Sequence, residues 1–232
     1  MIPIHHLRHS LAMTLGMAAS LAASPALAED DAQGWAAVTA SGAVRGDLFL
    51  WLEGQARFTD DLGGGTQFLL RPAIGARIGR DAHVVAGYAY VRTDPRGGAP
   101  SNEHRPWQQV QFAPLRLANG TPLLISRTRL EQRMVEGRDG TVWRLRQFVR
   151  VQVPLGRPGG IQAIATTEGF FNLNTTRWGV RTGVDQWRTF VGVGFPVLPN
   201  ARLEPGYLNQ RVVRPGDDRV NHVLSATLSV RL

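Results

Sequence analysis

The chain has no cysteine, so disulfide bonds, thiolate metal sites and cysteine nucleophiles are all excluded. It has no lysine either, because every one of its 26 basic residues is arginine. No apolar stretch reaches the roughly 20 residues that a helix needs to span a bilayer. Fourteen prolines and 26 glycines divide the 232 residues into short segments. The composition therefore disfavours long helices and leaves the domain count open.

The first 28 residues are typical of a secretory signal peptide. A short polar start around Arg8 precedes an apolar stretch from Leu11 to Ala23, and Ala26-Leu27-Ala28 stands before Glu29 as a small-residue cleavage site. We expect the mature chain to begin at Glu29. Because no cysteine follows this position, a lipid-anchored lipoprotein is not expected.

The charge balance is basic, with 26 arginines against 18 acidic residues. Such an excess often indicates nucleic-acid binding. An exported chain meets little nucleic acid, however, and these arginines are spread through apolar segments instead of one patch. We therefore expect no nucleic-acid partner.

From Asp47 onward, segments of about 10 to 13 residues alternate apolar and polar side chains, with Gly, Pro, Asn and Asp clusters between them. In the segment Leu48 to Phe58, Leu50 and Leu52 lie on one face, and Glu53 and Arg57 on the other. The final segment repeats this pattern. Tilted strands of 9 to 11 residues cross a bilayer, and strands with one apolar and one polar face are typical of outer-membrane barrels.

The alternation predicts an all-β protein: a single antiparallel transmembrane β-barrel of about ten strands over residues 47–232, in a bacterial outer membrane. Because lipid cannot hydrogen-bond an unpaired strand edge, the sheet must close. The segment 29–46 includes an extended stretch, Trp35 to Ala43, which we interpret as a partial or inward-lying strand. A complete crossing there would make eleven strands and break the even count expected for such barrels, and twelve strands are the alternative.

Six motifs run in order from Asn102 to His222. They are Asn102-Glu103-His104-Arg105-Pro106-Trp107-Gln108-Gln109, Arg129-Leu130-Glu131-Gln132-Arg133, Arg144-Leu145-Arg146, Glu168-Gly169-Phe170-Phe171-Asn172, Glu204-Pro205-Gly206-Tyr207-Leu208-Asn209-Gln210 and Asn221-His222. Together they resemble the family called domain of unknown function 2490, which comprises uncharacterised outer-membrane barrels of Gram-negative bacteria. The resemblance implies a fold and a location, and carries no established activity. The chain departs from the family at Pro205, where we expect a bend or bulge, and it ends in Leu232, where a terminal aromatic residue is commoner among barrels.

If the apolar faces meet lipid, the opposite faces place twelve arginines and five glutamates in the lumen. Two interpretations are open: a packed Arg–Glu plug, since buried charges need partners, or a narrow electropositive pore that prefers anions. The predicted lumen-lining charged residues are Glu53, Arg57, Arg71, Arg77, Glu103, Arg105, Arg127, Arg129, Glu131, Arg133, Arg144, Arg146, Arg150, Glu168, Arg188, Arg202 and Glu204.

Enzymatic patterns are sparse. His104 lies near Ser101, Asn102 and Glu103, which suggests an outer-membrane lipid hydrolase or acyltransferase as an alternative. Adjacent strand positions point to opposite faces, so Glu103 is poorly placed to orient His104. A structural or adhesion barrel acting through its outer loops is a further alternative. We expect no catalytic residues, no cofactor and no metal site. The expected partners are outer-membrane lipids and lipopolysaccharide, periplasmic chaperones and the barrel-assembly machinery during biogenesis, and small anions.

Overall fold

In a computed structural model of the protein, residues 29–157 and 159–232 are described, and they form eleven β-strands. The predicted signal peptide lies outside these residues. No helix in the described ranges is long and apolar enough to cross a membrane. The strands are β1 (Glu29–Arg45), β2 (Leu48–Thr59), β3 (Gly65–Ile78), β4 (Ala82–Asp94), β5 (Ser101–Arg116), β6 (Pro122–Val135), β7 (Val142–Pro154), β8 (Gln162–Asn172), β9 (Gly183–Leu198), β10 (Ala201–Val212) and β11 (Arg219–Arg231).

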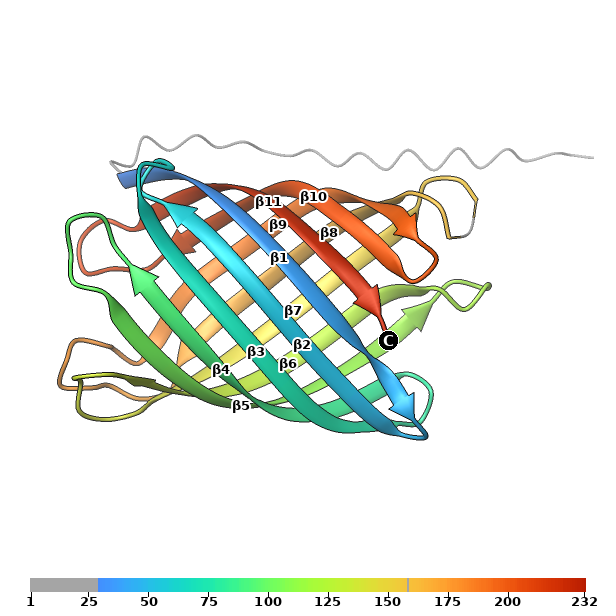
Figure 1. The fold of residues 1–232 in the computed structure, drawn as a ribbon, viewed down its shortest axis with the longest axis horizontal. Helices are drawn as coiled ribbons and strands as arrows, with labels where there is room; N and C mark the ends of the chain where they lie inside the picture. Colours follow the sequence, from blue (N-terminus) through green and yellow to red (C-terminus); the bar gives the residue numbers. More distant parts are fainter. Residues whose placement is uncertain (1–28, 158) are drawn as a thin grey trace, which may run out of the picture.

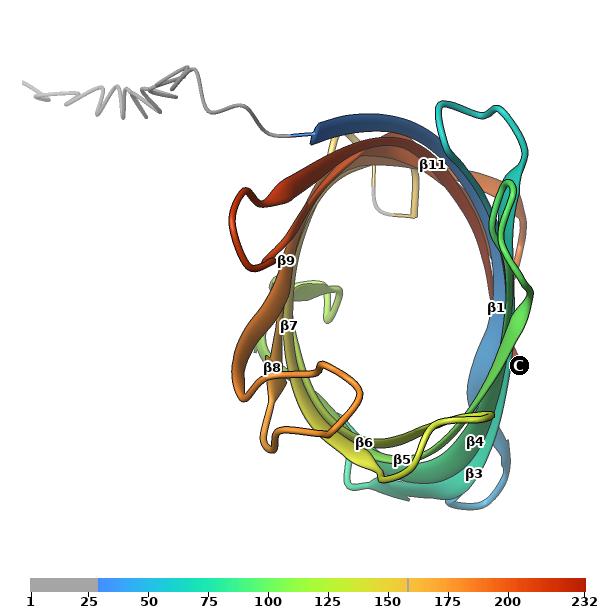
Figure 2. The same ribbon diagram turned by 90° about the vertical axis from the view of Figure 1, so that its left-hand side faces the viewer.

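The strands form one closed barrel in which each strand pairs with its neighbours in sequence, and β1 closes the ring against β11 (Figures 1 and 2). Every pair is antiparallel except β1–β11, which is parallel from Glu29–Arg219 to Ser41–Arg231. An odd number of strands requires this, because the first and last strands then run in the same direction. The barrel therefore has no unpaired edge.

The prediction of ten strands, with twelve as the alternative, is wrong because the segment 29–46 supplies a complete strand. β1 pairs with β2 from Gly34 to Arg45 and with β11 from Glu29 to Ser41. A partial or inward-lying strand would leave many of these backbone groups without partners, which is costly away from water. The even count assumed that the barrel begins and ends on the same side of the membrane, whereas eleven strands put the start of β1 and the end of β11 at opposite ends of the barrel.

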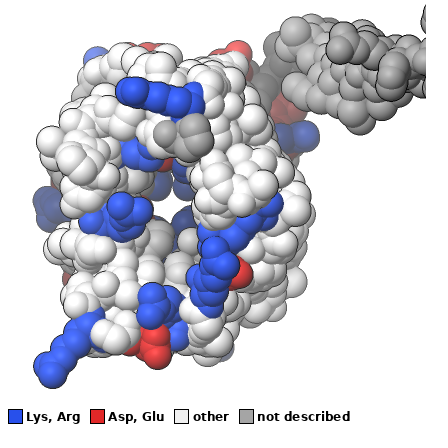
Figure 3. Space-filling model, turned by 90° about the vertical axis from the view of Figure 1, so that its right-hand side faces the viewer, with Lys and Arg blue, Asp and Glu red and all other residues white. Residues whose placement is uncertain are grey.

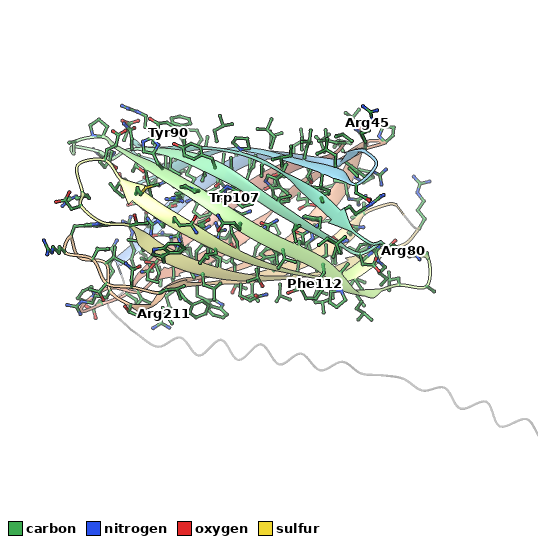
Figure 4. All side chains as sticks on the ribbon, turned by 90° about the horizontal axis from the view of Figure 1, so that it is seen from below. Arg45, Arg80, Tyr90, Trp107, Phe112 and Arg211 are labelled. Carbon is green, nitrogen blue, oxygen red and sulfur yellow. The ribbon has the colours of Figure 1, made fainter. Side chains whose placement is uncertain are left out.

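The connections gather at two ends of the barrel, as Figure 4 shows: Tyr90 and Arg211 lie at one end, and Arg45 and Arg80 at the other. The loop end carries the start of β1, and the turn end carries the C-terminus. The connections at the loop end are 60–64, 95–100, 136–141, 173–182 and 213–218. Those at the turn end are 46–47, 79–81, 117–121, 155–161 and 199–200.

Along each strand, side chains alternate between the outside and the lumen, because successive strand residues point to opposite faces. The outer face is apolar: Leu52, Leu70 and Ile74 are each at least half exposed. The inner face of the same strands carries Glu53 and Arg71, which are ion-paired at 2.8 Å. An exposed apolar surface of this extent is unusual for a soluble monomer and suits contact with acyl chains.

The predicted bend or bulge at Pro205 is absent. On the two sides of this proline, Leu203 lies opposite Phe195 and Gly206 opposite Gly192, in one unbroken register. Between these two pairs, Glu204 and Pro205 have no partner on β9, and proline has no N–H to donate. The register shift of this ladder lies elsewhere, between Ala201 and Arg202.

Part of the lumen is filled by an apolar cluster, made of Trp51, Val85, Ala89 and Trp107. The Trp107 side chain is fully buried and lies across Gly87, where an added Cβ would be 2.8 Å from the indole and 2.4 Å from a backbone oxygen. Only a glycine permits this close approach. The cluster occupies the β2–β5 side and leaves the remaining interior to polar residues.

Candidate functional site: the arginine-lined lumen

The structure places sixteen of the seventeen predicted charged residues on the lumenal side of the barrel wall. Arg77 is the exception. It has the inward-facing parity of β3 but lies at the turn-end rim, where its side chain is 49% exposed and pairs with Asp47 at 3.2 Å. The periodicity sets the face of a residue and not its depth in the barrel, which explains this difference.

Glu131 is the centre of a buried ion-pair network. Its side chain is 1% exposed and accepts hydrogen bonds from Arg144 at 2.6 Å and Arg146 at 2.6 Å. Arg129 approaches the same carboxylate at 3.8 Å, stacks on Trp107 and donates two hydrogen bonds to Gln109. Three arginines thus surround one carboxylate, in an arrangement that solvates it without water.

The other lumenal glutamates are also paired. Glu168 binds Arg127 at 3.0 Å and Arg146 at 2.8 Å, so Arg146 bridges it to the network around Glu131. Glu103 accepts from Arg105 at 2.6 Å and Arg133 at 2.5 Å. We call this surface the ion-pair wall, defined by Glu103, Arg105, Arg129, Glu131, Arg133, Arg144, Arg146 and Glu168 on β5 to β8.

One further ion pair and one arginine bound to the backbone lie beyond the ion-pair wall. Arg150 of β7 reaches Glu204 of β10 through two hydrogen bonds of 2.8 Å each, a bidentate contact between strands that are not neighbours. Arg202 donates instead to the backbone oxygens of Gly159 and Gly160 at the turn end. All five predicted lumenal glutamates therefore have arginine partners.

Sequence reasoning did not include Asp185 among the lumenal acids. β9 begins at Gly183, and the Asp185 carboxylate pairs with Arg144 at 3.2 Å and accepts from Asn172 at 3.1 Å. Strict alternation places Asp185 on the face opposite to Arg188, three residues further along β9, so both can face the lumen only where a bulge intervenes. Such an irregularity is present in the β8–β9 ladder between Phe170 and Phe171.

The opposite side of the lumen is lined by small residues. We call it the open wall, defined by Ala37, Thr39 and Ser41 of β1 and Ser225, Thr227 and Ser229 of β11, two adjacent strands in which Ala37 pairs with Thr227 and Thr39 with Ser229. Beside it lies a cavity of about 870 Å³ at the turn end. A second cavity of about 310 Å³ opens at the loop end. The lumen is therefore hollow along one side, and Figure 3 shows the opening at the turn end with arginines around it.

The two cavities share five lining residues, which we call the neck: Trp35, Arg57, Arg71, Arg146 and Arg188. Four of these five side chains are cationic. Arg129 and Glu131, by contrast, line neither cavity, because their side chains are buried within the ion-pair wall. The neck is thus the surface that the two cavities share, and its charge is positive.

Two arginines of the neck have no carboxylate within 4 Å among the residues that the structure describes. Arg57 donates to the amide oxygens of Gln55 and Gln67, and its guanidinium lies 4.0 Å from the Trp35 ring. Arg188 donates to Gln186 at 3.1 Å. Neutral amides satisfy hydrogen bonds but leave the positive charge uncompensated.

On the outer face, His104 lies near the loop end and contacts groups other than those the sequence suggested. Its Nδ1 is hydrogen-bonded to Tyr88, and its Nε2 lies 3.1 Å from Glu136. Glu103 points into the lumen, as the strand alternation requires. Within the described ranges, no hydrogen bond joins Ser101 to His104, and no group of three or more potential ligands could hold a metal ion.

A closed barrel with an apolar outer face and an ionic, partly hollow lumen defines a porin-like, membrane-type β-barrel. The chain belongs to the family described as Protein of unknown function (DUF2490), which matches residues 32–221. This confirms the resemblance found in the motifs between Asn102 and His222.

Similar proteins include an uncharacterised protein of Methylorubrum extorquens, which is 33% identical over 231 residues, covering 98% of this chain and 99% of the relative. Among solved structures, the NanC porin matches with a TM-score of 0.49 at 10% identity, over 80% of this chain and 89% of that one. The siderophore receptor PirA from Pseudomonas aeruginosa matches with a TM-score of 0.28 at 14% identity, over 78% of this chain and 34% of that one.

Proposed function

We propose that the protein is an integral outer-membrane β-barrel that lets small anions pass through its arginine-lined lumen. Its partners are then outer-membrane lipids and lipopolysaccharide, with periplasmic chaperones and the barrel-assembly machinery during biogenesis. The proposal is of a passage and not of an enzyme. It gives the loop end an outward orientation and the turn end a periplasmic one.

The observation that carries the proposal is the hollow space beside the open wall. A plug would need side chains across the whole lumen, but the Arg–Glu pairs are concentrated on one side and leave cavities of about 870 and 310 Å³. Liquid water occupies about 30 Å³ per molecule, so both spaces have room for several waters and a small solute.

The charge of the lining supports a preference for anions. Arginines that outnumber acids in a confined space raise the local concentration of negative solutes, most strongly at low ionic strength. The acids that line the turn-end cavity are Glu53, Glu168 and Glu204. The arginines that line it are Arg57, Arg71, Arg116, Arg127, Arg146, Arg150, Arg188, Arg202 and Arg231.

The apolar outer face supports the proposed membrane placement, which can be tested with Leu70, 54% exposed on β3. Leu70→Arg would place a charge against acyl chains, at a cost of about 2–4 kcal/mol near the bilayer centre. We expect less folded barrel in lipid vesicles, measured by heat-modifiable gel migration. Leu62→Arg, in the loop 60–64, is the control and should insert normally.

The passage can be tested with the purified full-length protein in planar bilayers under a KCl gradient. We expect a stable conductance whose reversal potential indicates anion preference. Arg188→Gln at the neck should lower that preference, whereas Arg77→Gln at the rim should leave it nearly unchanged. The absence of any conductance for the wild-type barrel, at all voltages, would show that the lumen is closed and refute the proposal.

A further inference from the structure

The neck contains two arginines that converge on one aromatic ring. Arg57 comes from β2, the neighbour of β1, and lies 4.0 Å from the Trp35 ring centroid. Arg188 comes from β9, separated from β1 by β10 and β11, and lies 4.9 Å from the same centroid. Their two guanidinium carbons are therefore less than about 9 Å apart. This separation lets a single oxyanion contact both groups.

Arg188 makes one hydrogen bond, from its Nη2 group to Gln186 at 3.1 Å, among the residues that the structure describes. Its guanidinium also lies 4.6 Å from the Phe170 ring, so aromatic rings are its main neighbours on two sides. Its Nε is buried and has no hydrogen-bond partner among the described residues. A guanidinium that stacks on rings still presents its N–H groups in its own plane, where a carboxylate or phosphate can accept two of them.

Neighbouring acids do not neutralise this pair, because they are already bound to other arginines. Glu53 pairs with Arg71 at 2.8 Å, and Glu168 pairs with both Arg127 and Arg146. Two positive charges therefore remain at the neck with only amides and aromatic rings as direct partners. Uncompensated positive charge in a confined space favours a ligand that carries two negative charges.

The Trp35 ring is held in place by a chain of hydrogen bonds that runs to the loop end. Its indole Nε1 donates to Gln33 at 2.8 Å, and Gln33 donates to Asp31 at 2.6 Å. Asp31 pairs with Arg219 of β11 and accepts from the backbone N–H of Asp61 at 2.8 Å. The surface between the two arginines is thus fixed before any ligand arrives, which lowers the entropic cost of binding.

We propose that Arg57 and Arg188, held around Trp35, form a binding site for one small dianionic oxyanion, such as a dicarboxylate, sulfate or phosphate. The role of this site in transport rests on the proposed function, because a bound anion would be the species selected at the neck. Binding itself does not require a current. The two properties can therefore be measured separately.

The test is calorimetric titration of the purified full-length barrel in detergent micelles with sodium sulfate and sodium succinate, against sodium chloride at matched ionic strength. We expect saturable binding of both dianions and weaker binding of chloride. Arg57→Gln and Arg188→Gln should each weaken dianion binding about tenfold or more, since each removes a charged hydrogen-bond partner. Arg77→Gln, already paired with Asp47 at the rim, should bind like the wild type.

Arg188→Lys keeps the positive charge and removes the planar guanidinium, so it should perturb folding less than Arg188→Gln. It should also bind dianions more weakly than the wild type. In parallel, the Trp35 indole N–H resonance, assigned with Trp35→Phe, should shift on titration with sulfate but not with chloride.

Unchanged dianion affinity in the Arg57 and Arg188 variants would overturn the inference, as would chloride binding equal to that of sulfate. Saturable binding to a barrel without conductance would retain the inference and refute the proposed passage. Anion-selective conductance without saturable dianion binding would retain the proposed passage and refute the inference of a dianion site.

Discussion

Glu131→Gln is the substitution that most directly tests the buried ion-pair network. The change keeps the size of the side chain and removes its negative charge. In the wild type, Arg144 and Arg146 donate hydrogen bonds to this carboxylate and Arg129 lies 3.8 Å away. The substitution would leave three guanidinium groups facing a neutral amide. With a side chain only 1% exposed, water cannot take over the lost interaction.

Removing one partner of a buried ion pair costs about 3–5 kcal/mol, because an uncompensated charge is left behind. For an unfolding slope of about 2 kcal/mol per molar urea, the midpoint should fall by about 1.5–2.5 M. The assay is urea unfolding of the barrel in lipid vesicles, followed by tryptophan fluorescence. Glu136→Gln, on the exposed loop after β6, is the matched control and should lower the midpoint far less, because its pair with His104 is exposed to solvent.

A double substitution separates loss of charge compensation from loss of packing. Arg129 has no other acid within 4 Å in the described chain. Arg129→Met therefore removes one of the three positive charges that Glu131→Gln leaves without a carboxylate. Glu131→Gln with Arg129→Met should therefore be less destabilised than the sum of the two single changes. Equal midpoints for Glu131→Gln and the wild type, or strict additivity in the double variant, would refute this account of the network.

Gly87→Ala should lower the urea midpoint by about 0.5–1.5 M, since overpacking costs about 1–3 kcal/mol and the new methyl would press on a backbone oxygen and an indole ring. Gly54→Ala, with nothing within 4 Å of the new Cβ, should show no loss, and equal effects at both glycines would contradict the packing argument. Hydrogen bonds from Asn102 and His104 lower the pKa of the Glu136 carboxyl below its ordinary value of 4.5. This carboxyl therefore stabilises the fold above about pH 4.5, and the contribution is lost as the pH falls through the lowered value. Asn102→Ala should raise the pKa in an NMR titration of the Glu136 carboxyl carbon, and an unchanged midpoint would show that the hydrogen bond does not set it.

The sequence by itself determined the strands and their two faces. A period of two is a local property, so the alternation over Leu48 to Phe58 was sufficient to locate β2 (Leu48–Thr59) and to separate Leu52 from Glu53. The turn residues between segments likewise located the strand ends to within a few positions. The same period of two places the arginine and glutamate side chains together on the lumenal side of the barrel wall.

Tertiary structure alone decided how the strands close and which charges meet. β1 has a weak alternation of apolar and polar residues because its lumenal side chains include Ala37, Thr39 and Ser41. Without β1, one edge of β2 and one edge of β11 would be unpaired, so its role in closing the ring is evident only in the whole sheet. The convergence of Arg57 and Arg188 on Trp35 joins residues from strands that lie apart in the sheet, so no local pattern encodes it. Curvature of the closed sheet brings these side chains together, and curvature is a property of the whole barrel.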